Sequence, residues 1–287
     1  MSKRGTAKAP STGRRGRREP LAAKVPEITA LFWVVKILTT GMGEATSDFL
    51  ANGNPAVAGL VGVGGFGLAL WLQFRVRRYY AAVYWLAAVS VAVFGTMVAD
   101  GLHVVVGIPY TGTVTLYAAL LAGVLFAWYR SEGTLSIHSI TTRRREVYYW
   151  CTVLATFALG TALGDFSATT LGLGFLDAGI AFTVLIAVPL IAWWKFRMNA
   201  ILAFWFAYVV TRPLGASFAD YLGKPKNIGG LAFGDGTVAA VASVVIVALV
   251  AYAVVTRNDV QRPAEPELTG PPTADTRRFL AAESSRD

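Results

Sequence analysis

The stretch from residue 32 to 48 reads FWVVKILTTGMGEATSD, and its spacing of aromatic-Trp, Gly and Asp recurs three more times along the chain. The other copies read YWLAAVSVAVFGTMVAD (84–100), YWCTVLATFALGTALGD (149–165) and FWFAYVVTRPLGASFAD (204–220). In every copy nine residues separate Trp from Gly and four separate Gly from Asp. This spacing, kept without an insertion, predicts four tandem repeats.

Each repeat carries two apolar segments long enough to cross a bilayer, since about 20 helical residues span the ~30 Å hydrocarbon layer. These runs are too long and too uniformly apolar for barrel strands. The sequence therefore predicts an all-α integral membrane protein with eight transmembrane helices in four parallel two-helix repeats. The eight segments are 28–50, 56–74, 81–105, 111–129, 147–169, 174–194, 199–222 and 236–256.

Composition supports a membrane protein, because 55% of the 287 residues are hydrophobic, only 15% are charged, and the mean hydropathy is +0.52. Soluble domains carry about a quarter charged residues, so this composition argues against an ordinary cytosolic enzyme. The net charge of +9 does not indicate nucleic-acid binding, because it is concentrated in an N-terminal tail and in loops. The single cysteine, Cys151, is expected to be a small core residue.

Three parts follow from this distribution. We expect a disordered basic tail over 1–25, a transmembrane domain over 26–256, and a second disordered tail over 257–287. The repeats are expected at about 26–74, 79–129, 144–194 and 199–256.

Basic residues mark one side of the predicted bundle. They follow the second, fourth and sixth helices, and the loops after the first, third and fifth helices have none. The positive-inside rule then places both termini in the cytoplasm, with Lys224 and Lys226 as a mild exception. Because each repeat crosses the membrane twice, all four copies enter from the same side, and we expect a multi-pass protein of the bacterial plasma membrane.

Four tandem two-helix repeats, each marked by Trp, resemble the bacterial membrane-anchored family named after a tandem repeat of unknown function. The resemblance covers roughly residues 26–256. It implies the same architecture, and it leaves the chemistry to be argued from the residues.

The repeated aromatic and small residues have two interpretations. The tryptophans favour an aromatic belt at the membrane interface, with a lining or gating role as the alternative. The glycines favour close helix contact. These markers are Trp33, Trp85, Trp150, Trp205, Gly43, Gly95, Gly160 and Gly215.

The repeated acids, Asp48, Asp100, Asp165 and Asp220, lie near the ends of the odd-numbered helices. The negative pole of the helix dipole disfavours an anion there. One interpretation is structural, with each Asp accepting hydrogen bonds from the free N–H groups of the next helix. The other is a cation or proton site.

Further polar residues favour the site. Glu44 lies one helical turn before Asp48, and Lys36 and Arg212 also lie inside odd helices. Ionisable residues inside transmembrane helices are rare and commonly mark functional sites. We expect Lys36 and Arg212 to act as counter-ions in salt bridges, for example with Glu44 or Asp220.

The sequence therefore favours a small secondary transporter or permeation pathway for a cation, either a metal ion or a proton-coupled solute, that uses the acidic residues of the odd-numbered helices. The partners expected are the lipid bilayer and the cation; no cofactor, nucleic acid or enzymatic activity is expected. The alternative is a non-transporting scaffold, in which the Asp residues cap helices and the basic tail binds lipid or a partner.

Overall fold

The structure is a computed structural model that describes residues 23–261, and within these residues it contains eight long helices. Their positions agree with the eight predicted segments. The helices are α1 (Ala30–Gly53), α2 (Pro55–Arg75), α3 (Ala81–Asp100), α4 (Tyr110–Glu132), α5 (Arg143–Asp165), α6 (Gly174–Phe196), α7 (Ala200–Gly223) and α8 (Asp235–Thr256).

Seven of these helices are long and apolar enough to cross a membrane, whereas α1 is long enough but not apolar enough. The expected eighth spanning segment is present as α1, but it is less apolar than the other seven. The reason is that Lys36, Glu44 and Asp48 lower its hydropathy, and Lys36 and Glu44 are buried inside the bundle. A helix whose charges face other helices can still present apolar residues to lipid.

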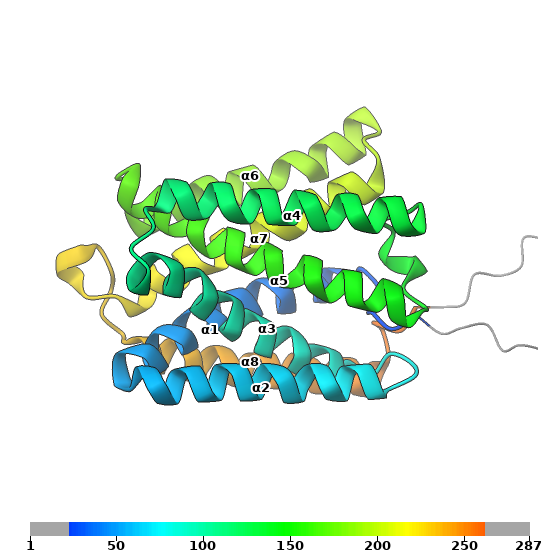
Figure 1. Cartoon of the computed structure of the whole chain (residues 1–287), viewed down its shortest axis with the longest axis horizontal. Coiled ribbons are helices and arrows are strands. Elements are labelled where there is room, and N and C mark those ends of the chain that lie inside the picture. Colours follow the sequence, from blue (N-terminus) through cyan, green and yellow to red (C-terminus); the bar gives the residue numbers. More distant parts are fainter. Residues whose placement is uncertain (1–22, 262–287) are drawn as a thin grey trace, which may run out of the picture.

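The four odd-numbered helices pack into a closed inner ring, and the even-numbered helices lie outside it as an outer ring. In Figure 1 the odd-numbered helices lie between α4 and α6 on one side and α2 and α8 on the other. Each even helix packs against the odd helix of the following repeat, and α8 closes the circle on α1. In the even helices only 17–22% of the most apolar window is buried, against 56–72% for α3, α5 and α7. The outer ring is therefore the lipid-facing one.

The repeated glycines set the distance between neighbouring odd helices. A methyl group on Gly43 would lie 2.5 Å from the Cβ of Ala92, and one on Gly95 would lie 2.7 Å from the Cβ of Phe157. A methyl group on Gly160 would likewise clash with the side chain of Arg212, and one on Gly215 would clash with that of Thr40. Each glycine thus faces the residue three positions before the glycine of the next repeat, so the packing order α1–α3–α5–α7–α1 is cyclic and depends on small residues at the helix contacts.

The aromatic-Trp pairs form a second closed ring, not an interfacial belt. Phe32 packs on Trp85, Tyr84 on Trp150, Tyr149 on Trp205 and Phe204 on Trp33, with ring centroids 5.6–6.3 Å apart. Three of the four tryptophans are at most 5% exposed, and Trp33 is half-buried. The belt interpretation is therefore wrong, because the aromatic side chains turn inward and fill the centre of the inner ring.

Segments that flank the helices close the end of the bundle from which the odd helices start, which we call the terminal end. The backbone of Glu27 bonds to that of Asp259, and Lys24 donates to Glu146 at 2.6 Å while Gln73 donates to the same carboxylate. Residues 23–25 and 257–261 thus belong to the packed domain, although the sequence assigned them to the tails. The rest of both predicted tails, 1–22 and 262–287, lies outside the described residues.

Candidate functional site

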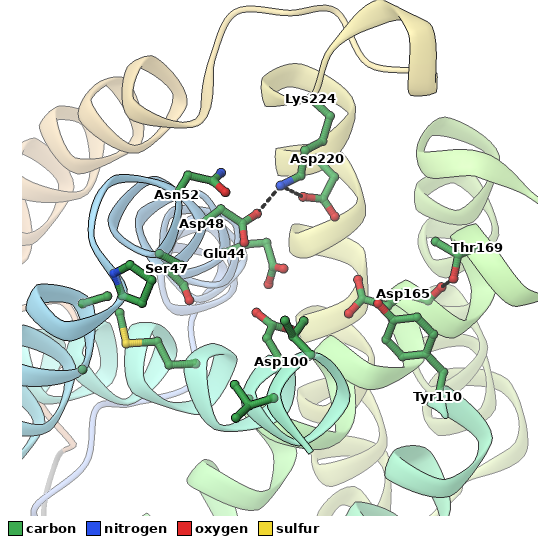
Figure 2. A pocket seen from close by; sticks show the side chains of 18 of the residues that line it. Glu44, Ser47, Asp48, Asn52, Asp100, Tyr110, Asp165, Thr169, Asp220 and Lys224 are labelled. Carbon is green, nitrogen blue, oxygen red and sulfur yellow. Dashed lines mark hydrogen bonds and ion pairs between the residues drawn. The ribbon is translucent and has the colours of Figure 1, made fainter. Parts of the chain in front are cut away.

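A polar pocket of about 610 Å³ opens at the end of the bundle opposite the terminal end. Figure 2 shows carboxylates from all four odd helices turned toward this one space. The pocket brings together all five acids that the sequence singled out. They are Glu44, Asp48, Asp100, Asp165 and Asp220.

The repeated Asp residues lie within helical structure, beyond the glycine contacts along each odd helix. Every odd helix continues for three to five residues beyond its Asp, through α-helix in the first and fourth repeats and through π-helical turns at Gly101–Val105 and Phe166–Thr170 in the second and third. Short π-helical turns occur frequently at functional sites. The acids therefore lie inside the helical region, just short of the helix ends.

Glu44 lies at the centre of the acidic group. It forms one cluster with Asp165 and Asp220, and a second cluster with Asp48 and Asp100. Within each cluster one carboxylate oxygen from every residue lies within 4.8 Å of the others. Carboxylate oxygens at this spacing can converge on one cation, since hard cations take several oxygen ligands at 2.0–2.6 Å.

The aspartates do not cap the following helices. Asn54 caps α2 through its side chain, and the N-cap residues of α4, α6 and α8 (Pro109, Leu173 and Gly234) provide no side-chain cap. No described backbone N–H donates to any of the four Asp side chains. Helix capping, the structural interpretation of the repeated Asp, is thus absent from the described residues.

Arg212 closes the inner end of the pocket. Its guanidinium donates to Glu44 at 2.6 Å, and this ion pair is buried, with the two side chains 1% and 4% exposed. It also donates to the carbonyl of Thr40 at 3.0 Å and to the hydroxyls of Thr161, at 2.7 Å, and Thr96. The predicted counter-ion role of Arg212 therefore appears as a bond network that joins all four odd helices.

Lys36 does not have the expected acidic partner. Among the described residues it forms no ion pair, and its ammonium instead lies 4.0 Å from the ring centroid of Phe157 and 4.2 Å from that of Tyr208. Such cation–π contacts stabilise a desolvated ammonium. The salt-bridge expectation fails because Arg212, from the neighbouring helix α7, occupies the position beside Glu44.

Lys224 is a pocket residue that the sequence analysis placed in an external loop. Its ammonium lies 2.5 Å from Asp48, 3.8 Å from Asp220 and 3.7 Å from Asp235. Burial alone would lower the pKa of Lys224, but these three carboxylates outweigh it and raise the pKa above its ordinary value. Its position in the sequence could have indicated this, because Lys224 follows Asp220 by one helical turn, as Asn52 follows Asp48.

The pocket keeps a negative balance after these pairings. Five acids against Arg212 and Lys224 leave a formal charge of −3. Neutral oxygen donors, including Ser47, Asn52 and Tyr110, line the same pocket. The donor set is made of oxygen atoms, as Mg²⁺, Ca²⁺ and Mn²⁺ prefer.

Below the pocket the inner ring is filled. The Arg212 network comes first, the Lys36 ammonium and its aromatic partners follow, and the ring of aromatic-Trp pairs lies beyond them. Each of these layers consists of side chains that are largely buried. In this conformation these layers close the pocket toward the terminal end of the bundle.

The four repeats match a family model described as a repeat of unknown function (DUF347), over residues 31–79, 83–134, 148–199 and 203–259. These segments cover well over half of the chain and agree with the repeats read from the sequence. No curated protein and no solved structure matches the chain.

Proposed function

The chain therefore belongs to the family built from this repeat of unknown function, and from the chemistry of its pocket we propose that it binds a divalent cation and carries it across the membrane. One observation carries the proposal. Five carboxylates, contributed by four helices that are far apart in the sequence, face a single pocket.

Their placement favours a ligand over a purely structural role. Glu44 and Asp220 are 3% and 6% exposed, so their charge is costly unless it is compensated. Arg212 and Lys224 compensate part of it, while Asp100 and Asp165 form no ion pair with any described residue. A divalent cation would supply much of the missing positive charge.

The layers beneath the pocket fit a transport cycle of alternating access. Passage requires the Glu44–Arg212 pair to separate and the ring of aromatic-Trp pairs to part, which a change in the packing of the odd helices can achieve. The four glycine contacts are smooth, closely packed interfaces along which neighbouring odd helices can shift relative to one another. With the termini in the cytoplasm, as the basic loops favour, this conformation opens its pocket to the outside.

Binding is tested first on the purified full chain in detergent. Isothermal titration with Mn²⁺, Mg²⁺ and Ca²⁺ is expected to show one saturable site. The double variant Asp100→Asn/Asp165→Asn should weaken it by about tenfold or more, because two charged ligands are lost. The matched control is Asp177→Asn, an exposed acid in the first turn of α6 that does not line the pocket.

Transport is tested in proteoliposomes with an entrapped fluorescent indicator for the ion that binds. Uptake that depends on Asp100 and Asp165 supports the proposal. Saturable binding without any flux would favour the scaffold, and unchanged binding in the double variant would refute the cation site. The proposal contains no catalytic step.

A further inference from the structure

A second pocket lies on the side of the bundle, between α3 and α8. It has a volume of about 590 Å³, and its lining is apolar apart from Ser243. Buried Met42 and Trp85 line it, as do exposed valines of α8 such as Val247, 68% exposed, and Val255, 81% exposed. An apolar groove in the lipid-facing ring has the chemistry of an acyl-chain site.

At the terminal end this groove meets a polar pocket of about 340 Å³, and the two share Ala82 and Val254. Arg78 and Arg257 line the polar pocket. Neither arginine forms an ion pair with a described residue. Arg78 donates one hydrogen bond, from its Nε to the hydroxyl of Tyr80, and its guanidinium lies 5.0 Å from the centroid of the same ring. Two guanidinium groups at the mouth of an apolar groove match a phosphate attached to acyl chains.

The start of α3 adds to this positive potential. Ala81 and Ala82 form its first turn and line the polar pocket, and the N-cap residue Tyr80 provides no side-chain cap. The N–H groups of a first helical turn have no partner within the helix. They are therefore available, together with the helix dipole, to an anion at this position.

Asp259 supplies a third, independent feature. It lines the same polar pocket and is only 3% exposed. Its Oδ2 accepts a hydrogen bond from the hydroxyl of Tyr79, whereas its Oδ1 has no partner among the described residues. Leaving a buried carboxylate oxygen without a hydrogen bond is unfavourable in free energy. A ligand with a hydrogen-bond donor beside its phosphate would remove this cost.

We propose that this composite site binds one molecule of phosphatidylglycerol. The acyl chain lies in the groove between α3 and α8, the phosphate lies between Arg78 and Arg257, and a glycerol hydroxyl donates to Oδ1 of Asp259. Charge favours this lipid over a zwitterionic one, because two arginines and one aspartate leave the polar pocket at a formal +1. The site is distinct from the acidic pocket at the other end of the bundle.

The test is native mass spectrometry of the full chain in detergent, titrated with individual lipids. One phosphatidylglycerol is expected to be retained, more tightly than phosphatidylcholine or phosphatidylethanolamine. Arg78→Gln/Arg257→Gln should reduce the retained fraction by about tenfold or more. The control is Arg75→Gln/Arg77→Gln, which removes the arginine at the end of α2 and one in the loop that follows. Neither lines the polar pocket, so the retained fraction should not change.

Two further comparisons locate the two parts of the lipid. Val247→Trp fills the groove and should displace the lipid, whereas Val241→Trp, at an exposed valine of α8 outside the groove, should not. Phosphatidylmethanol has the same charge as phosphatidylglycerol but no headgroup hydroxyl, so it should bind more weakly. In the variant Asp259→Asn the difference in affinity between these two lipids should be smaller. Equal binding of all lipids, tighter binding of phosphatidylethanolamine, or no effect of Arg78→Gln/Arg257→Gln would overturn the proposal.

Discussion

Replacing Arg212 by methionine removes the guanidinium that links the four odd helices. The side chain is 1% exposed, and its ion pair with Glu44 spans 2.6 Å. Removing one partner of a buried ion pair costs about 3–5 kcal/mol, because the other charge is left uncompensated. Here the cost is expected in the upper part of that range, since the acidic pocket would go from a formal −3 to −4.

Removing the charge of the other partner, Glu44, is expected to lower the free energy of unfolding by less. Glu44→Gln leaves Arg212 with three oxygen acceptors, from Thr40, Thr96 and Thr161, and it reduces the acidic charge to −2. We therefore expect a loss of about 1–2 kcal/mol. The double variant should lose at least about 1 kcal/mol less than the sum of the two single variants, because residues in contact are coupled.

The assay is reversible unfolding in detergent with increasing sodium dodecyl sulfate, followed by tryptophan fluorescence. Arg130→Met, an exposed arginine of α4, is the control and should change the free energy of unfolding by less than about 0.5 kcal/mol. The reasoning fails if Arg212→Met is as stable as the wild type, if Glu44→Gln is the more damaging change, or if the two effects add.

Three other predictions use the same unfolding assay. Gly95→Ala should cost about 1–3 kcal/mol, because its methyl group would lie 2.7 Å from the Cβ of Phe157, whereas Gly123→Ala meets nothing within 4 Å and should be nearly neutral; equal effects would contradict the cyclic packing. Lys24→Gln should cost about 3–5 kcal/mol, because the fully buried Glu146 loses its cation, and Lys195→Gln, at an exposed lysine, is the control that should show no such loss. Burial and the bond to Asp259 raise the pKa of Tyr79, so its neutral hydroxyl stabilises the fold below the unfolded pKa of about 10, and this contribution is lost as the pH rises above it. Tyr79→Phe should therefore flatten the decline in stability between about pH 9 and 11, and an unchanged decline would exclude this role.

The sequence by itself determined the repeat, the eight helices and the difference between odd and even helices. The reason is that the repeated Trp, Gly and Asp keep a fixed spacing, and a fixed spacing on a helix fixes both the face and the depth of each side chain. Asp48, Asp100, Asp165 and Asp220 could be assigned to one level for this reason. The glycines could likewise be assigned to helix contacts.

Only the tertiary structure decided which helix stands beside which, and with it every pairing of charges. A sequence does not give the rotation of one helix against its neighbour, so Lys36 and Arg212 were equivalent candidates for Glu44. The cyclic packing of glycines places α7 against α1, which brings Arg212 to Glu44 and leaves Lys36 among aromatic rings. The same packing turns the tryptophans inward and brings Lys224 back over Asp48, contacts between residues too far apart in the sequence for any local pattern to show.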